Sequence, residues 1–252
     1  MAIYLGNKKV GMRGLVIDNS KLAQIVDRTV TEITANDLKG ATKIGNYAFA
    51  SCSKLISIEI PDGVTSIGNS AFKDCTNLTG VTIGNSVTSI GAEAFNSCKG
   101  LTSVEIPDSV TSIGNSAFKD CTNLTGVGIE DNSQLTSIES YAFSGCSKLT
   151  SIEFGENSQL ASIGYEAFRY CRSLTSIVIP KGVTSIGSTA LDIGISYAKS
   201  TVRMLPTTPP TIQSTTIGST VEKIIVPKGC LEAYQTATNW SAKASIMEEE
   251  VV

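Results

Sequence analysis

The feature that most constrains this chain is an internal repeat. The dipeptide Ala-Phe recurs along the sequence, and its successive phenylalanines are separated by 23, 23, 23, 25 and 25 residues. They are Phe49, Phe72, Phe95, Phe118, Phe143 and Phe168. One further step of 23 residues reaches Leu191, which again follows an alanine. A unit of this length cannot bury its own apolar face, so we expect the units to stack as coils of a solenoid and share one core.

The pattern inside one unit predicts the path of each coil. In residues 101–106 the first, fourth and sixth positions are apolar, which is the strand signature of a leucine-rich repeat. Pro107 cannot donate to a ladder and ends that strand. Residues 110–113 predict a second extended run, and 115–121 predict one helical turn with Phe118 pointing inward. The expected fold class is a right-handed, mainly β leucine-rich repeat solenoid of 23–25-residue repeats, with short helical turns and a parallel sheet on its concave face.

Three regions follow from where the repeat begins and ends. Residues 1–29 are expected to be an N-terminal capping segment, 30–192 the leucine-rich repeat solenoid, and 193–252 irregular last coils with a C-terminal cap. Two insertions, at 130–134 and 155–159, replace the Pro-x-x-Val corner of the repeat. We expect them to bulge outward as loops and to leave the register of the core intact.

Both ends allow finer expectations. Near the N-terminus, 4–5 and 15–17 are expected to pair as a small hairpin over the first coil, and 30–33 resembles a degenerate V-T-S-I strand at which the solenoid starts.

At the C-terminus, 217–252 is expected to cap the solenoid. Residues 224–226 would add a last strand, 231–237 would form a helix, and Trp240 would pack beneath that helix.

Six of the 7 cysteines share one repeat position, three residues after each phenylalanine. Zinc sites use close pairs such as C-x-x-C, which this sequence does not contain. One cysteine per coil predicts instead a buried column of small apolar side chains. We therefore expect reduced, unmetallated thiols at Cys52, Cys75, Cys98, Cys121, Cys146 and Cys171, whereas Cys230 falls outside the column.

Composition and motif placement argue against catalysis. The chain has no histidine and a formal charge of −3, which removes His-dependent triads and gives no basic footprint for nucleic acid. A spacing found in some acyltransferases, Ser-x-x-Lys, occurs several times. Most copies repeat with the framework, which favours a structural role: Ser51/Lys54, Ser70/Lys73, Ser116/Lys119 and Ser196/Lys199. We expect no enzyme activity, no cofactor and no metal.

Three glutamates share one outward strand position. They are Glu59, Glu105 and Glu153, separated in their column by Thr82 and Gly128. Their spacing of about two coils, roughly 9–10 Å, would suit a pair of acid and base carboxylates. An open sheet offers no cleft to raise the pKa of either, so solvated surface glutamates are the favoured interpretation.

The repeated string I-G-x-x-A-F-x-x-C-x-x-L-T-x-I-x-I-P resembles the BspA-like family of bacterial leucine-rich repeats over about residues 30–252. Segments 208–210, 224–229, 233–234 and 239–240 of the tail also match. The resemblance implies a solenoid at a bacterial cell surface or outside the cell, binding proteins or mediating adhesion. No signal peptide is visible at the N-terminus of the sequence.

The favoured function is therefore non-enzymatic protein binding of the adhesion type. One alternative is a phage or prophage virion protein, tail-associated, with a structural or host-recognition role, because 3–10 is similar to the opening of phage structural proteins. Another alternative is a spacer solenoid without its own ligand. We expect a monomer without a membrane span, and a partner that is a protein or peptide with some basic character. The partner is expected to bind the concave face at these residues: Glu59, Thr79, Thr82, Thr102, Glu105, Thr125, Thr150, Glu153 and Thr175.

Overall fold

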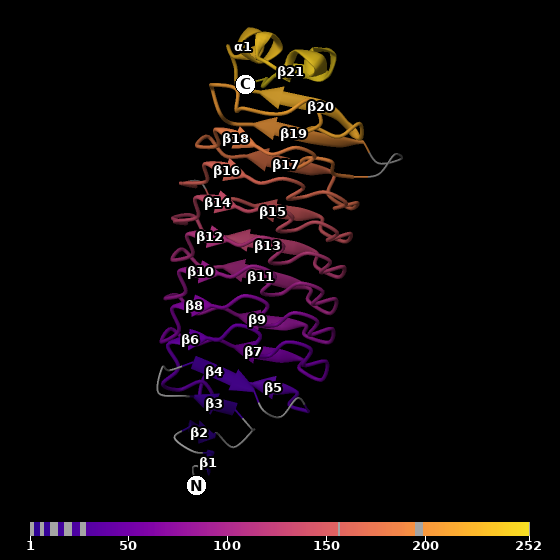
Figure 1. The fold of residues 1–252 in the computed structure, drawn as a ribbon. Helices are drawn as coiled ribbons and strands as arrows, with labels where there is room; N and C mark the ends of the chain where they lie inside the picture. The colour runs from indigo at the N-terminus through magenta and orange to yellow at the C-terminus, as the bar shows by residue number, and fades with distance from the viewer. Residues whose placement is uncertain are drawn as a thin grey trace.

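The chain winds as successive coils that stack into an elongated column (Figure 1). The computed structural model describes the backbone of residues 3–5, 8–10, 15–17, 22–25, 29–155, 157–194 and 199–251, and their side chains from residue 29 onward. Strands at equivalent positions of neighbouring coils pair in parallel, as the repeat predicts. The predicted parallel β-solenoid is thus confirmed.

Each repeat coil contributes two strands. We call the strand that carries the L-x-x-L-x-L pattern the first strand. These are β5 (Glu32–Ile33), β7 (Ser57–Glu59), β9 (Gly80–Thr82), β11 (Ser103–Ile106), β13 (Gly126–Ile129), β15 (Ser151–Glu153) and β17 (Ser176–Ile179). The second strands, which follow the Pro-x-x-Val corner, are β6 (Lys43–Ile44), β8 (Ser66–Ile67), β10 (Ser89–Ile90), β12 (Ser112–Ile113), β14 (Ser137–Ile138), β16 (Ser162–Ile163) and β18 (Ser185–Ile186).

The two strand columns differ in continuity. All the second strands lie in one 11-stranded sheet together with β1–β4. The first strands instead fall into three hydrogen-bonded groups, β5-β7-β9, β11-β13-β15 and a group that begins at β17. Within the described chain, β15 and β17 are therefore stacked neighbours in different sheets.

The N-terminal region corrects two expectations. Strands β1 (Ile3–Leu5), β2 (Lys8–Val10), β3 (Leu15–Ile17) and β4 (Leu22–Ile25) pair antiparallel in sequence order, so β2 lies between the two segments expected to form a hairpin. Strand β4 then pairs in parallel with β6. Strand β5 pairs with β7, which makes 30–33 a first strand rather than a copy of the V-T-S-I second strand.

The turn that carries the repeated phenylalanine is not a continuous helix. Within 115–121 the Lys119 N–H donates to the Ser116 carbonyl at 3.1 Å, as in a helical turn. Ser116 and Asp120, however, have φ values of 55° and 58°, a left-handed conformation that stops a right-handed helix. The Phe118 N–H then donates at 2.8 Å to the equivalent alanine carbonyl of the next coil. This third side of the coil is thus also tied to its neighbour by backbone hydrogen bonds.

The repeated phenylalanines form the predicted buried ladder. All six side chains are fully buried. Their rings stack nearly parallel between adjacent coils, with centroids 5.0 to 5.6 Å apart and interplanar angles of 1° to 6°. Leu191, which takes the next phenylalanine position, is fully buried as well.

The repeated cysteines are buried beside this ladder as expected, but they do more than fill space. The Cys75 thiol donates a hydrogen bond to the Phe49 carbonyl of the preceding coil, with Sγ and O 3.0 Å apart. The same bond recurs at 3.1–3.2 Å from Cys98, Cys121, Cys146 and Cys171. Burial disfavours the thiolate and raises the pKa of Cys171 to about 12. The column is therefore held as neutral thiols.

The two insertions leave the core register intact, as expected. Across the first insertion Ser112 pairs with Ser137, and across the second Ser137 pairs with Ser162. The insertions also contact each other, because the Asn157 N–H donates to the Asp131 carbonyl at 3.1 Å.

The C-terminal segment adds three strands and two short helices. Strands β19 (Ser200–Met204), β20 (Val221–Val226) and β21 (Met247–Glu249) continue the sheet from β17, with α1 (Leu231–Thr236) and the 3₁₀ helix η1 (Ser241–Ile246) between the last two. The helix prediction is confirmed, but β20 is not the last strand, because β21 pairs beyond it. Tyr234 and Trp240 are fully buried and meet edge to face at 5.0 Å.

Candidate partner-binding surface

The outward positions of β7 to β17 form one surface, which we call the first-strand face. The pairing register places Glu59 beside Thr82, and Gly128 between Glu105 and Glu153. All nine residues predicted for partner binding lie on this face or at its leading edge and are exposed. Their assembly into one continuous surface agrees with the alignment deduced from the repeat, whereas their role in binding stays a prediction.

The threonines at the leading edge of this face, which is the edge where the first strands begin, already use their hydroxyl groups in hydrogen bonds within the chain. The Thr125 hydroxyl donates to the Thr102 carbonyl of the preceding coil at 3.0 Å, and the Thr150 hydroxyl donates to the Thr125 carbonyl at 2.9 Å. Thr79 and Thr102 repeat this bond at 3.2 and 3.4 Å. These hydroxyls therefore tie coils together and offer a partner their methyl groups and oxygen lone pairs.

Two of the glutamates are separated only by a glycine. A Cβ on Gly128 would lie 1.8 Å from Glu105 Oε2, so the Glu105 carboxylate covers the bare glycine between it and Glu153. We call Glu105 and Glu153 the acidic strip. Glu59 is separate from it, because its carboxylate accepts a hydrogen bond from the Ala35 N–H at 3.2 Å.

A groove of about 200 Å³ opens at the trailing edge of the first-strand face, which is the edge where the first strands end. It is lined by Phe154, Gly155, Ser158, Val178, Pro180, Lys181 and Leu205. This groove was not predicted from the sequence. The sequence does contain a sign of the groove, because several of its residues depart from the repeat. Val178 takes the position of Glu105. Gly155 and Leu205 both take the position of Pro107.

A second hollow, of about 420 Å³, lies beside the C-terminal strands and is more polar. Its lysines are neutralised by neighbouring carboxylates, since Lys199 pairs with Glu222 at 2.7 Å and Lys223 with Glu248 at 2.5 Å. Charge pairing inside the chain thus uses the groups that an anionic ligand would need.

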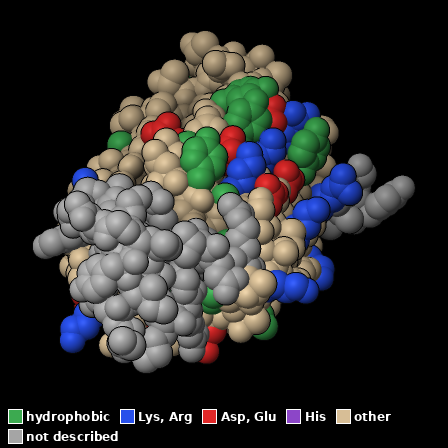
Figure 2. Space-filling model, turned by 60° about the horizontal axis from the view of Figure 1, so that its bottom comes forward, with side chains coloured by type: hydrophobic (Ala, Val, Ile, Leu, Met, Phe, Trp, Pro, Cys, Tyr) green, Lys and Arg blue, Asp and Glu red, His purple; other side chains and the backbone are tan. Residues whose placement is uncertain are grey.

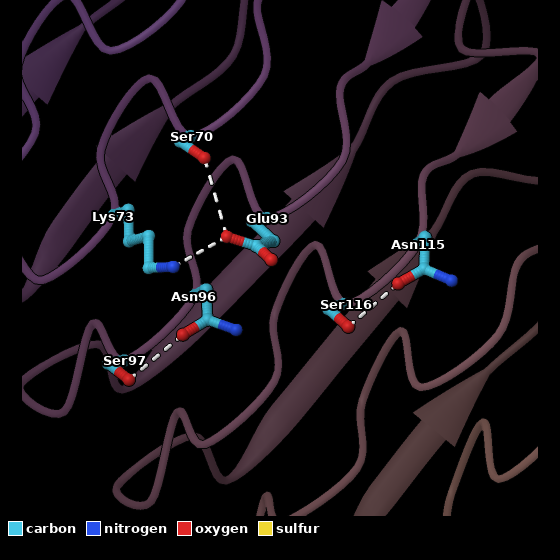
Figure 3. Close-up of polar contacts among 7 residues, drawn as sticks. All are labelled: Ser70, Lys73, Glu93, Asn96, Ser97, Asn115 and Ser116. Carbon is cyan, nitrogen blue, oxygen red and sulfur yellow. Dashed lines mark hydrogen bonds and ion pairs between the residues drawn. The ribbon is translucent and has the colours of Figure 1, made fainter.

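In the described pairs Ser70/Lys73 and Ser116/Lys119, serine and lysine bind other groups rather than each other. The Ser70 hydroxyl and the Lys73 ammonium both donate to Glu93 Oε2, at 3.4 and 2.6 Å (Figure 3). The hydrogen bond to Glu93 raises the pKa of Lys73, so the amine stays protonated and cannot accept a proton from serine. Ser116 donates instead to Asn115 Oδ1 at 2.9 Å. Of the remaining copies, Ser196 lies outside the described residues.

The turns between the second and first strands carry a network of aromatic and charged side chains that the sequence analysis missed. Lys119 lies over the Tyr141 ring at 5.3 Å, and that ring meets Tyr165 edge to face at 5.2 Å. A hydrogen bond to Glu166 raises the pKa of Tyr165 to about 12. On the part of the surface seen in Figure 2, basic, acidic and hydrophobic side chains are interspersed among uncharged ones.

Within the described ranges, no group of three or more His, Cys, Asp or Glu side chains is placed to hold a metal ion. Among the helices of those same ranges, none is long and apolar enough to cross a bilayer.

The chain is similar to several solved leucine-rich repeat proteins. Solved structures similar to this chain include a leucine-rich repeat protein of T. pallidum, 21% identical, with a TM-score of 0.46 over 61% of this chain and 82% of that one. A leucine-rich repeat protein from Bacteroides ovatus is 20% identical, with a TM-score of 0.41 over 98% and 75%. A leucine rich cell surface protein from Faecalibacterium prausnitzii is 21% identical, with a TM-score of 0.39 over 100% and 95%. No curated protein matches the chain.

The family model described as BspA type leucine rich repeat region (6 copies) matches residues 42–157 and 128–224, which is most of the chain. These matches span the stacked phenylalanines, the thiol column and both insertions. The chain therefore belongs to the BspA-type leucine-rich repeat family.

Proposed function

We propose that this protein is a non-enzymatic binding solenoid of the adhesion type, associated with a bacterial surface, and that it engages protein partners through the first-strand face. The observation that carries the proposal is the alignment of outward strand positions from coil after coil into one exposed surface. Stacked repeats commonly use such a surface to bind partners.

The chemistry of the face suggests the partner's charge. The acidic strip carries two carboxylates in one column, with only Gly128 between them, and the flanking positions carry uncharged threonines, serines and glycines. Carboxylates repel phosphate, so the face suits a protein with basic character better than a nucleic acid.

The test is capture of soluble extracellular-matrix proteins by the immobilised chain, compared between surface variants. The double variant Glu105→Lys, Glu153→Lys should lose most of the captured protein that the parent retains. A matched variant, Lys73→Gln with Lys119→Gln, changes two charges on the turns and should retain it.

Two results would contradict the proposal. Capture that is unchanged in the glutamate variant and lost in the lysine variant would move the site to the turns. Absence of capture by the parent across the panel would favour a spacer without its own ligand.

A further inference from the structure

The groove at the trailing edge of the first-strand face lies where two irregularities of the solenoid coincide. The first is a change of coil length, because the insertion at 155–159 stacks on the shorter corner that begins with Pro180. The second is the interruption of the first-strand ladder between β15 and β17. The other change of corner length, from the corner that begins with Pro107 to the insertion at 130–134, lies inside the continuous ladder of β11 and β13. The other interruption of the ladder, between β9 and β11, lies between corners of equal length. The groove is thus a local consequence of a step in the repeat.

The residues at this step are more apolar than the repeat would supply. Val178 stands where other coils have Glu59, Thr82 or Glu105, and its side chain is 40% exposed. Phe154 replaces the buried isoleucine of other coils and remains partly exposed beside Val178. An isolated surface apolar residue needs no explanation, but several that line one concavity of about 200 Å³ form a site for an apolar group.

Charge around the groove is arranged asymmetrically. Glu153 directly precedes the lining residue Phe154 and continues the acidic strip. Lys181, on the following coil, is part of the lining itself. Neither Glu153 nor Lys181 forms an ion pair with another described residue, and both side chains are exposed. A ligand that carries a cation beside an apolar group is therefore favoured in one orientation, with its cation over the acidic strip and away from Lys181.

We propose that this groove receives one bulky apolar side chain from an extended segment of a partner protein, and that a basic residue of the same segment lies over the acidic strip. This inference rests on the proposed function and names the partner's chemistry at one point of the first-strand face. In an extended segment, residues two positions apart point to the same side, so the sequence Arg-x-Phe presents both groups together.

The probe is the capped synthetic peptide acetyl-Gly-Arg-Gly-Phe-Gly-Ser-amide, titrated into the full chain with labelled valine and leucine methyl groups. The methyl resonances of Val178 and Leu205 should shift and give a dissociation constant. Replacing the peptide's phenylalanine with alanine should weaken binding about 10–100-fold, because the buried apolar area is lost. Replacing its arginine with glutamate should weaken binding up to about 5-fold, and added salt should reduce that difference.

Variants of the chain test the groove directly. Val178→Thr keeps the shape of the side chain and restores a residue type that the repeat already uses at Thr82, so it should fold normally. It should weaken binding about 3–10-fold, because a hydroxyl then faces the apolar group. Thr82→Val is the matched control: it adds a valine at the same column position away from the step and should leave binding unchanged. Glu153→Gln should remove the preference for arginine over glutamate in the peptide.

The outcomes separate this inference from the proposed function. Peptide shifts confined to the face around Thr102 and Thr125, and unaffected by Val178→Thr, would overturn the groove while leaving the first-strand face as a binding surface. No methyl shift at the highest peptide concentration would also overturn the groove. In that case capture by the glutamate and lysine variants described above decides the proposed function separately.

Discussion

Two stretches of this chain, 64–81 and 110–127, have the same sequence but different neighbours, because they lie two coils apart. Inside the solenoid they behave alike. The thiols of Cys75 and Cys121 each donate to a phenylalanine carbonyl of the preceding coil, at 3.0 and 3.2 Å. Their left-handed serines, Ser70 and Ser116, have φ values of 53° and 55°. The interior of a coil is thus reproduced wherever its sequence recurs.

On the surface the same two stretches differ. Lys73 pairs with Glu93 of the following coil at 2.6 Å, whereas the identical Lys119 lies over the ring of Tyr141 (Figure 3 shows Lys73 with Glu93). Both lysines reach the same position one coil further along, and the residue found there decides the interaction. The repeat therefore specifies the core, and the surface chemistry of a coil is specified by its neighbour.

The largest expected effect tests whether the two interiors are equivalent. Phe72→Ala and Phe118→Ala should each lower the free energy of unfolding by about 3–5 kcal/mol, because each removes a fully buried ring that stacks on two others. Urea unfolding followed by circular dichroism measures both. A difference larger than about 1 kcal/mol between them would show that the neighbouring coils also determine the energetics of the core.

The thiol column gives the next largest effect. Cys75→Ala and Cys121→Ala should each cost about 1–3 kcal/mol, since a buried sulfur and its hydrogen bond to a carbonyl are lost together. A thiol-specific reagent checks the same column in the parent protein: Cys230 should react in the folded state, and the six repeat cysteines only after unfolding. Rapid reaction of the repeat cysteines in the folded protein would contradict a buried, neutral column.

A smaller effect is expected at the second stretch alone. Tyr141→Leu removes the ring beneath Lys119 and should lower the free energy of unfolding by about 0.5–1 kcal/mol. Lys119→Met in the Tyr141→Leu background should then cost little more. If the two substitutions are instead fully additive in a double-mutant cycle, the lysine and the ring are not coupled.

The smallest effect is expected at the first stretch, and it depends on pH. The hydrogen bond from Lys73 lowers the pKa of Glu93 in the folded state. Its stabilisation is therefore complete above the ordinary pKa of a glutamate and disappears as the pH falls through the lower folded-state pKa. Glu93→Gln should cost about 0.2–1 kcal/mol at neutral pH, because both side chains are partly exposed. Thermal unfolding between about pH 6 and pH 3 should show the parent and variant converging at the acidic end; a constant difference would contradict this role.

The comparison of the two stretches also explains how much could be predicted from the sequence. The buried phenylalanines, the buried cysteines and the preserved register across the insertions follow from the period, because identical coils above and below leave each core residue one possible environment. The helix at Leu231–Thr236 and the burial of Trp240 followed from local pattern.

What escaped prediction depends on contacts between coils. The left-handed backbone at Ser116 interrupts a segment whose composition suggests a helical turn, because its N–H groups pair with the next coil instead. The hydroxyl of Thr125 and the thiol of Cys121 look like packing or solubility groups in the sequence, yet both donate to carbonyls of the preceding coil. The groove beside Val178 arises from a mismatch between two successive corners, which no single repeat reveals.

The backbone bonds between coils, together with these thiol and hydroxyl bonds, have a mechanical consequence. They run along the axis of the column. A force that pulls the two ends of the column apart therefore breaks the bonds between coils one interface at a time. We expect stretching to proceed in steps, each releasing a coil of 23–25 residues, or about 75–90 Å of extended chain. A solenoid of this kind would lengthen under tension by discrete increments while its unopened coils stay folded.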